Sequence, residues 1–206
     1  MAELAALRKT FDAWREGPTT AASELRWLAE ALEERGHAAF VLGGAIREAH
    51  LRGPDATPKD LDVVVDIDSV DQLLELDGFD HVHANSFGGM RGLRNDIVFD
   101  LWPLKSTWAF VHGHVQDVTF ENLPATTSLT IEAIAAQVAC GNAIYDAGFL
   151  QSLSDRVIDV NLEPLPRPKQ VFGRARALAD RMQFRFGSRL QALMTSGCND
   201  RRSSRR

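Results

Sequence analysis

The sequence lacks the features that mark secreted, membrane and fibrous proteins. Its 206 residues include only two cysteines, Cys140 and Cys198, too few for a disulfide framework or a cysteine-rich zinc site. No segment approaches the roughly 18 consecutive apolar residues that a membrane-spanning helix needs, and the N-terminus has no uninterrupted apolar stretch like that of a secretion signal. Eight prolines and 15 glycines exclude collagen-like and low-complexity chains. We therefore expect a soluble, cytoplasmic globular protein.

Charge is unevenly distributed along the chain, whose net charge is -5. Residues 167–206 contain 11 Lys and Arg but only two Asp and Glu, whereas residues 1–166 contain 12 and 26. A basic end on an acidic body is typical of proteins that bind nucleic acid away from an acidic metal site. A basic end that folds back on the acidic body, or forms a solvated face, explains the pattern equally well.

Hydrophobic periodicity predicts an α+β fold with a mixed or antiparallel sheet flanked by helices. We divide the chain into a domain at 1–163 and a basic, neck-like segment at 164–206, in which one long helix reaches about residue 194 and a disordered tail follows from 197. Helices are expected over 1–16, 19–36, 45–51, 69–76, 126–140 and 149–153. Strands are expected over 38–42, 61–67, 79–83, 91–94, 97–102, 143–145 and 157–160, with one more inside 110–120.

The segment 40–66 carries the first chemical signal. A buried strand ends at Gly43 and Gly44, and a helix begins at once. Two glycines let a ligand approach the backbone closely, and the free N–H groups at a helix start favour anions. Arg47, one turn into this helix, is placed to reach a phosphate. A tight packing turn has the same pattern, so the segment needs support from elsewhere in the chain.

That support comes from acidic residues. Asp60 and Asp62 are two residues apart at the start of a strand, so both side chains leave the same face. Neighbouring carboxylates repel each other and are stable together mainly when a cation lies between them. With no Cys or His nearby, the oxygen ligands favour Mg²⁺ over zinc. The alternative is an ordinary edge strand with two solvated acids.

Asp100 is the candidate third carboxylate, because it interrupts an otherwise apolar strand at 97–102. Three carboxylates at one site predict metal-assisted nucleotidyl transfer, with two Mg²⁺ ions about 3.5–4 Å apart. Asp60 and Asp62 would bind both ions. Asp100 would bind the catalytic ion and help to activate the acceptor hydroxyl. Trp102 and Trp108, which lie close to Asp100 in sequence, either stack on a base or pack in the core, and packing is the favoured reading.

The two motifs together resemble a known family. They read Gly43-Gly44-Ala45-Ile46-Arg47-Glu48 and Lys59-Asp60-Leu61-Asp62. This pattern resembles the head domain of class II tRNA nucleotidyltransferases (CCA-adding enzymes) and bacterial poly(A) polymerases, in the polymerase-β-like nucleotidyltransferase superfamily. The resemblance implies a nucleotidyltransferase head domain at 1–163. It also implies that Gly43, Gly44, Arg47 and Lys59 bind the nucleotide and that Asp60, Asp62 and Asp100 hold the metals.

The resemblance continues into the C-terminal half with clear departures. Residues 174–184 resemble the family's neck helix, so that Arg174 and Arg181 are candidate RNA contacts. The family's Arg-Arg-Asp trio, which reads the incoming base and phosphates, is replaced by Thr126, Thr127 and Ser128. The position of a family asparagine holds Glu132, which would either repel a triphosphate or supply another ligand.

The leading hypothesis is an Mg²⁺-dependent nucleotidyltransferase that moves a nucleoside monophosphate from an NTP to an RNA 3′ end or another hydroxyl, releasing pyrophosphate. A catalytically silent nucleotide- or RNA-binding module of the same fold is the alternative from a different class. A third hypothesis is transfer to a protein or a small molecule. The sequence supports the type of reaction better than it supports CCA addition.

Overall fold

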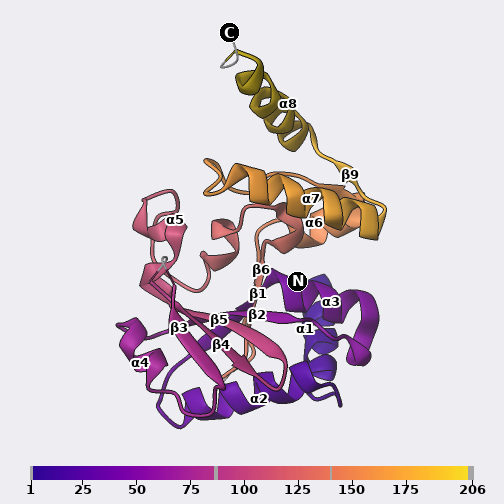
Figure 1. Ribbon diagram of the computed structural model, residues 1–206. Helices are drawn as coiled ribbons and strands as arrows, with labels where there is room; N and C mark the ends of the chain where they lie inside the picture. The colour runs from indigo at the N-terminus through magenta and orange to yellow at the C-terminus, as the bar shows by residue number, and fades with distance from the viewer. Residues whose placement is uncertain (1, 86–87, 140, 204–206) are drawn as a thin grey trace.

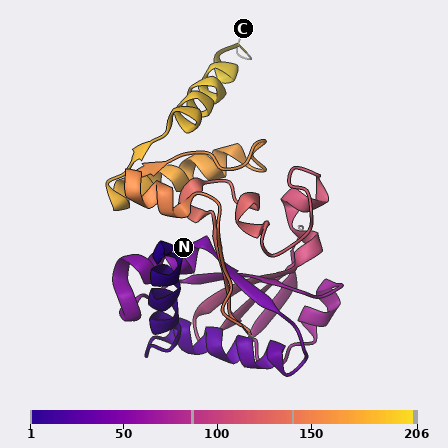
Figure 2. The same cartoon turned by 180° about the vertical axis from the view of Figure 1, so that it is seen from behind.

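The computed structural model describes residues 2–85, 88–139 and 141–203. A seven-stranded sheet forms the centre, helices cover it, and the last helix projects away from the rest of the molecule (Figures 1 and 2). The predicted α+β class is confirmed. Within the described part of the chain, no helix combines the length and apolar character needed to cross a bilayer.

The helices are α1 (Ala2–Arg15), α2 (Thr20–Glu33), α3 (Gly43–Arg52), α4 (Val70–Leu74), α5 (Trp108–Val111), α6 (Phe149–Asp155), α7 (Pro168–Met182) and α8 (Ser188–Ser203). Short 3-10 helices are η1 (Gly53–Asp55), η2 (Leu104–Ser106), η3 (Leu123–Thr126) and η4 (Thr130–Glu132). The strands are β1 (Ala39–Leu42), β2 (Asp60–Val65), β3 (His81–Ala84), β4 (Met90–Arg94), β5 (Ile97–Pro103), β6 (Ile134–Gln137), β7 (Ile144–Asp146), β8 (Val157–Ile158) and β9 (Arg185–Phe186).

The large sheet has the strand order β3-β4-β5-β2-β1-β6-β7. Its neighbours are antiparallel except for β2 and β5, which run parallel in the centre. In that parallel pair Asp62 lies opposite Asp100. The topology therefore brings together two acids that are far apart in the sequence.

Alternation along β2 and β5 decides which face of the sheet carries these acids. Leu61, Val63, Phe99 and Leu101 are fully buried in the main core, to which α1 and α2 also contribute. The residues between them point to the opposite face, where Val64 packs in a smaller apolar cluster that includes residues of α5 and η3. Asp62 and Asp100 lie on that second face.

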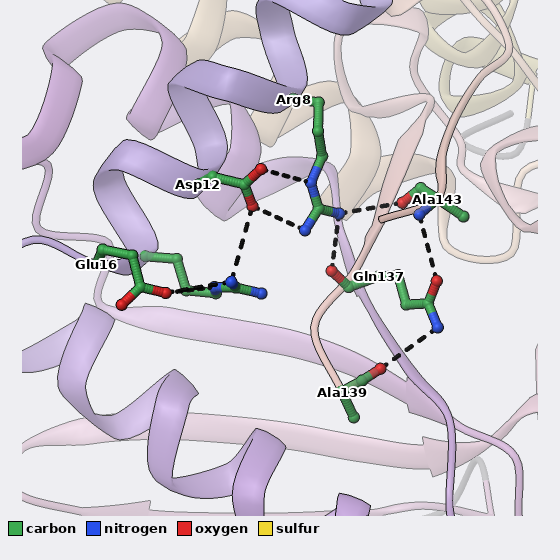
Figure 3. A network of polar contacts seen from close by, with 7 residues as sticks. Arg8, Asp12, Glu16, Gln137, Ala139 and Ala143 are labelled. Carbon is green, nitrogen blue, oxygen red and sulfur yellow. Dashed lines mark hydrogen bonds and ion pairs between the residues drawn. The ribbon is translucent and has the colours of Figure 1, made fainter. Parts of the chain in front are cut away.

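Helix α1 is fixed to the sheet by a polar network that reaches across the fold (Figure 3). The Arg8 guanidinium is paired with Asp12, with its Nε 3.0 Å from Oδ2. It also donates to the carbonyl oxygens of Gln137, at 2.9 Å, and Ala143, at 3.2 Å. Arg8 is only 7% exposed. The first helix of the chain is thus bonded to the ends of the connection between β6 and β7.

Three expectations about local structure were wrong. The segment predicted as a helix over 126–140 contains η4 and strand β6, which pairs with β1. No strand forms in the described segment 110–120, where α5 ends and turns follow. The long C-terminal helix is divided into α7 and α8 by β9, which pairs with β8.

Helix α8 also continues to Ser203, into the segment expected to be disordered. The rest of that tail, residues 204–206, and Cys140 lie outside the described residues. The proposed division of the chain at residue 163 stays a prediction.

Candidate active site

A cavity of about 470 Å³ opens on the second face of the sheet. Its walls include Leu42 at the start of α3, the two register-paired acids Asp62 and Asp100, and residues of α5, η3 and the segment before α7. The cavity therefore reaches from the strand acids to the residue that precedes the glycine turn. Gly43, Gly44, Arg47 and Asp60 are not among the residues that line it.

Asp62 is the acid whose properties depend most on this environment. Burial raises the pKa of its carboxyl to about 7, and repulsion from the carboxylates of Asp60, Asp100 and Glu132 acts in the same direction. Arg174 opposes this shift in pKa. The excess of negative charge is what a divalent cation bound to hard oxygen ligands would neutralise.

The Asp100 carboxylate is not free, because it already forms an ion pair with the side chain of Arg91. Arg91 on β4 binds Asp100 in a bidentate pair, Nε to Oδ1 at 2.9 Å and Nη2 to Oδ2 at 2.5 Å. This contact raises the pKa of Arg91 above its usual value. Nowhere in residues 2–85, 88–139 and 141–203 are three acidic, imidazole or thiol side chains already grouped to hold a metal.

The donor chemistry therefore fits Mg²⁺, while the side-chain positions do not yet enclose an ion. Asp62 and Asp100 would hold it, with Asp60 beside them, once Asp100 leaves Arg91. Asp60 is exposed at the first position of β2, and its charge still acts on Asp62. Lys59, the preceding residue, is also exposed.

Arg91 is a site residue that the sequence motifs do not include, although the chain carries a signal for it. Asn95 and Asp96 both have positive φ, 47° and 64°, and form a two-residue hairpin turn between β4 and β5. A turn of that length fixes the register, which places Arg91 opposite Asp100. The Asn-Asp pair therefore predicts the contact once the two strands are recognised.

The two glycines of the turn have different surroundings. A Cβ on Gly43 would lie 2.3 Å from the carbonyl oxygen of Glu132, so only glycine fits between α3 and η4. A Cβ on Gly44 would meet no atom within 4 Å. Gly43 thus serves packing, and Gly44 leaves open space beside the first backbone N–H groups of α3.

Arg47 does not extend into the cavity as a free cation. It is 7% exposed, and its nitrogens lie 3.4 Å from Glu48 and 3.5 Å from Glu132. The Nε and Nη1 atoms are buried without a hydrogen-bond partner. Both candidate RNA contacts belong to the same network: Arg174 lies 3.0 Å from Glu132, and Arg181 lies 2.6 Å from Glu48.

Thr126 and Thr127 line the cavity at the positions where the resemblance places base-reading residues. Their hydroxyls are turned to local backbone, Thr126 to the carbonyl of Leu123 at 2.6 Å and Thr127 to that of Pro124 at 3.0 Å. Trp102 lines the cavity and also packs in the second apolar cluster, so the favoured packing reading describes part of its role.

Solved structures show the same fold. A CCA-adding enzyme with CTP matches with a TM-score of 0.66 and 18% identity, over 98% of this chain and 47% of that one. The Thermotoga maritima CCA-adding enzyme complexed with tRNA matches at 0.65 and 17%, over 96% and 45%. A tRNA nucleotidyltransferase with a primer tRNA and an incoming ATP analogue matches at 0.57 and 21%, over 85% and 50%.

These likenesses establish a fold like that of the head domain of class II tRNA nucleotidyltransferases. The chain spans about half the length of the solved structures that it matches. No family model and no curated protein matches its sequence.

Proposed function

We propose that the chain is an Mg²⁺-dependent nucleotidyltransferase that moves a nucleoside monophosphate from an NTP to a hydroxyl at an RNA 3′ end or on another acceptor. The single observation that carries this proposal is the parallel pair β2–β5, which sets Asp62 beside Asp100 at a cavity next to the glycine turn of α3. Structural neighbours described with CTP, an ATP analogue and tRNA support it.

The residues of this chain would divide the reaction between them. Backbone N–H groups beside Gly44 and the Arg47 guanidinium would hold the triphosphate. The acceptor oxygen would bond to the α-phosphorus while the bond from that phosphorus to the oxygen bridging to the β-phosphate breaks. Pyrophosphate would leave, and the proton of the acceptor hydroxyl would pass to solvent. Asp100, released from Arg91, would orient the acceptor hydroxyl near the α-phosphorus. Bound Mg²⁺ would supply acidity for the acceptor hydroxyl and neutralise the charge of the leaving group.

The experiment is label transfer by the full chain with Mg²⁺, total RNA and each of four NTPs labelled at the α-phosphate. We expect labelled RNA from the wild type and loss of at least about a hundredfold in Asp62→Ala, since a metal ligand would be removed. Asp68→Ala is the matched control, because that carboxylate is exposed and its ion pair is with Lys105, another exposed residue. Equal transfer by both variants would refute the proposed site.

A catalytically silent nucleotide- or RNA-binding module is the second candidate. The Arg91–Asp100 pair favours it, because this pair already neutralises the third carboxylate. NTP binding without transfer to any acceptor, in the same assay, would support the module. Label that appears on protein or in a small product, and not on RNA, would support a nucleotidyltransferase whose acceptor is not RNA.

A further inference from the structure

Glu132 is held in a fixed place beside the N-terminal end of α3, where the proposed function places the phosphates of the NTP. Its backbone packs against Gly43 so closely that no Cβ fits between them. Its side chain is only 15% exposed. An acid is electrostatically favoured at this position, because a helix start and a neighbouring guanidinium attract anions. It therefore stands where the proposed function would place an external phosphate.

The Glu132 carboxylate bridges two arginines. Oε1 lies 3.5 Å from Nη1 of Arg47, and Oε2 lies 3.0 Å from Nη2 of Arg174. The same carboxylate helps to raise the pKa of Asp62, so its negative charge also acts on an acid that is proposed to bind the metal. Glu132 therefore supplies negative charge where the proposed function needs the phosphates of an NTP.

The contact with Arg47 is incomplete. At 3.5 Å the pair exceeds the length of an ordinary hydrogen bond, and both Nε and Nη1 of Arg47 are buried without a hydrogen-bond partner. Buried guanidinium nitrogens are rarely left in this state. Two unsatisfied donors beside an open glycine turn are suited to oxygens of a ligand that replaces or joins the carboxylate.

We propose that Glu132 is an internal anion that competes with the triphosphate of the NTP for Arg47 and Arg174, and so sets how tightly the nucleotide binds. This inference rests on the proposed function. The sequence left open whether Glu132 repels a triphosphate or supplies another metal ligand, and this inference favours repulsion. A triphosphate complexed with a divalent cation would meet less of this repulsion than a free triphosphate.

The test compares the full-length wild type with Glu132→Gln, which keeps the shape and removes the charge. The probes are inorganic triphosphate and an ATP analogue with a methylene between the α- and β-phosphates, measured by calorimetry with and without Mg²⁺. We expect Glu132→Gln to bind both probes about tenfold more tightly without Mg²⁺, with a smaller gain in its presence. Glu163→Gln is the control, since its carboxylate pairs with Arg189 outside the site; its affinity should equal that of the wild type.

Unchanged or weaker binding by Glu132→Gln would overturn the inference, even if the wild type transfers label to RNA. If neither protein binds triphosphate and the wild type transfers no label, the proposed function fails as well. Thermal unfolding is recorded for each protein, and Glu132→Asn provides a second uncharged variant. If both uncharged variants fail to fold, Glu132 is a structural partner of the arginines, and the inference is wrong.

Discussion

At the scale of single residues, the raised pKa of Asp62 links protonation to folding. An ordinary aspartate has a pKa of 3.8, whereas that of Asp62 in the folded protein is about 7. The folded state therefore binds a proton more tightly than the unfolded state. The resulting stabilisation is fully present below about pH 4 and is lost as the pH rises through about 7.

We therefore predict that Asp62→Asn stabilises the metal-free protein at pH 8, by about 2–4 kcal/mol, and has little effect near pH 4. The asparagine cannot ionise, so it avoids the cost of a buried charge among carboxylates. Urea denaturation at the two pH values measures this difference. Asp66→Asn, at an exposed position following the same strand, should change stability little at either pH. Equal effects of Asp62→Asn on the free energy of unfolding at pH 4 and pH 8 would contradict the raised pKa of Asp62.

Arg91 offers a second prediction at this scale. Its bidentate pair neutralises Asp100, so Arg91→Met should leave the carboxylate free and tighten Mn²⁺ or Mg²⁺ binding by about three- to tenfold. Titration calorimetry in the absence of nucleotide measures the affinity. Lys105→Met removes an equally exposed cation from a pair with Asp68 and should leave metal affinity unchanged. Weaker metal binding by Arg91→Met would mean that Arg91 shapes the site and does not block it.

The sequence predicts which residues gather at the site more readily than what each one contacts. Asp62 and Asp100 stand out because acids in apolar strands need a reason, and the parallel pairing brings them together. The pairing of Arg47 with Glu132 depends on how η4 packs against Gly43, 89 positions away in sequence. No local pattern encodes that contact, so from the sequence alone Arg47 resembles a free cation.

At the scale of elements, the helix propensity of a segment gave the wrong prediction where pairing with a distant strand determined the structure. The segment around Ile134 is rich in alanine, which predicts a helix, yet it forms β6 and bonds to β1. Three of its four residues are buried in the sheet. Helix propensity amounts to a few tenths of a kcal/mol per residue, which sheet hydrogen bonds and burial exceed.

The attachment of α1 to the sheet gives a prediction about stability. Arg8→Met should destabilise the protein by about 3 kcal/mol, because it leaves two backbone carbonyl oxygens and Asp12 without their donor. Arg15→Met is the matched control on the same helix. Its guanidinium is more exposed, it lies 3.9 Å from Asp12, which Arg8 holds more closely, and its other partner is the exposed Glu16, so the loss should stay below about 1 kcal/mol. Urea denaturation of both variants at neutral pH makes the comparison, and equal losses would show that the network is not stabilising.

At the scale of the whole molecule, the charge asymmetry along the sequence has a partial explanation in the structure. Arg174 and Arg181 on α7 pair with Glu132 and Glu48, so part of the basic end does fold against the acidic body. These two arginines therefore fit the reading in which the basic end folds back, and RNA contact by this helix stays a prediction. Arg176 lies on the same helix, is exposed, and has no ion pair within the part of the chain that the structure describes.

This difference predicts how each arginine contributes to RNA binding. Removing an arginine that binds an RNA phosphate should reduce the slope of log affinity against log salt by about one. Arg176→Gln should do so with a labelled single-stranded RNA, because its guanidinium is available to a phosphate. Arg181→Gln should change the slope less, since binding RNA through Arg181 first requires breaking its 2.6 Å pair with Glu48. Arg35→Gln, an exposed arginine beyond the end of α2, controls for net charge. A larger effect of Arg181→Gln than of Arg176→Gln would mean that RNA displaces the ion pairs of α7, and that the neck-like helix binds RNA through the residues that now hold it to the body.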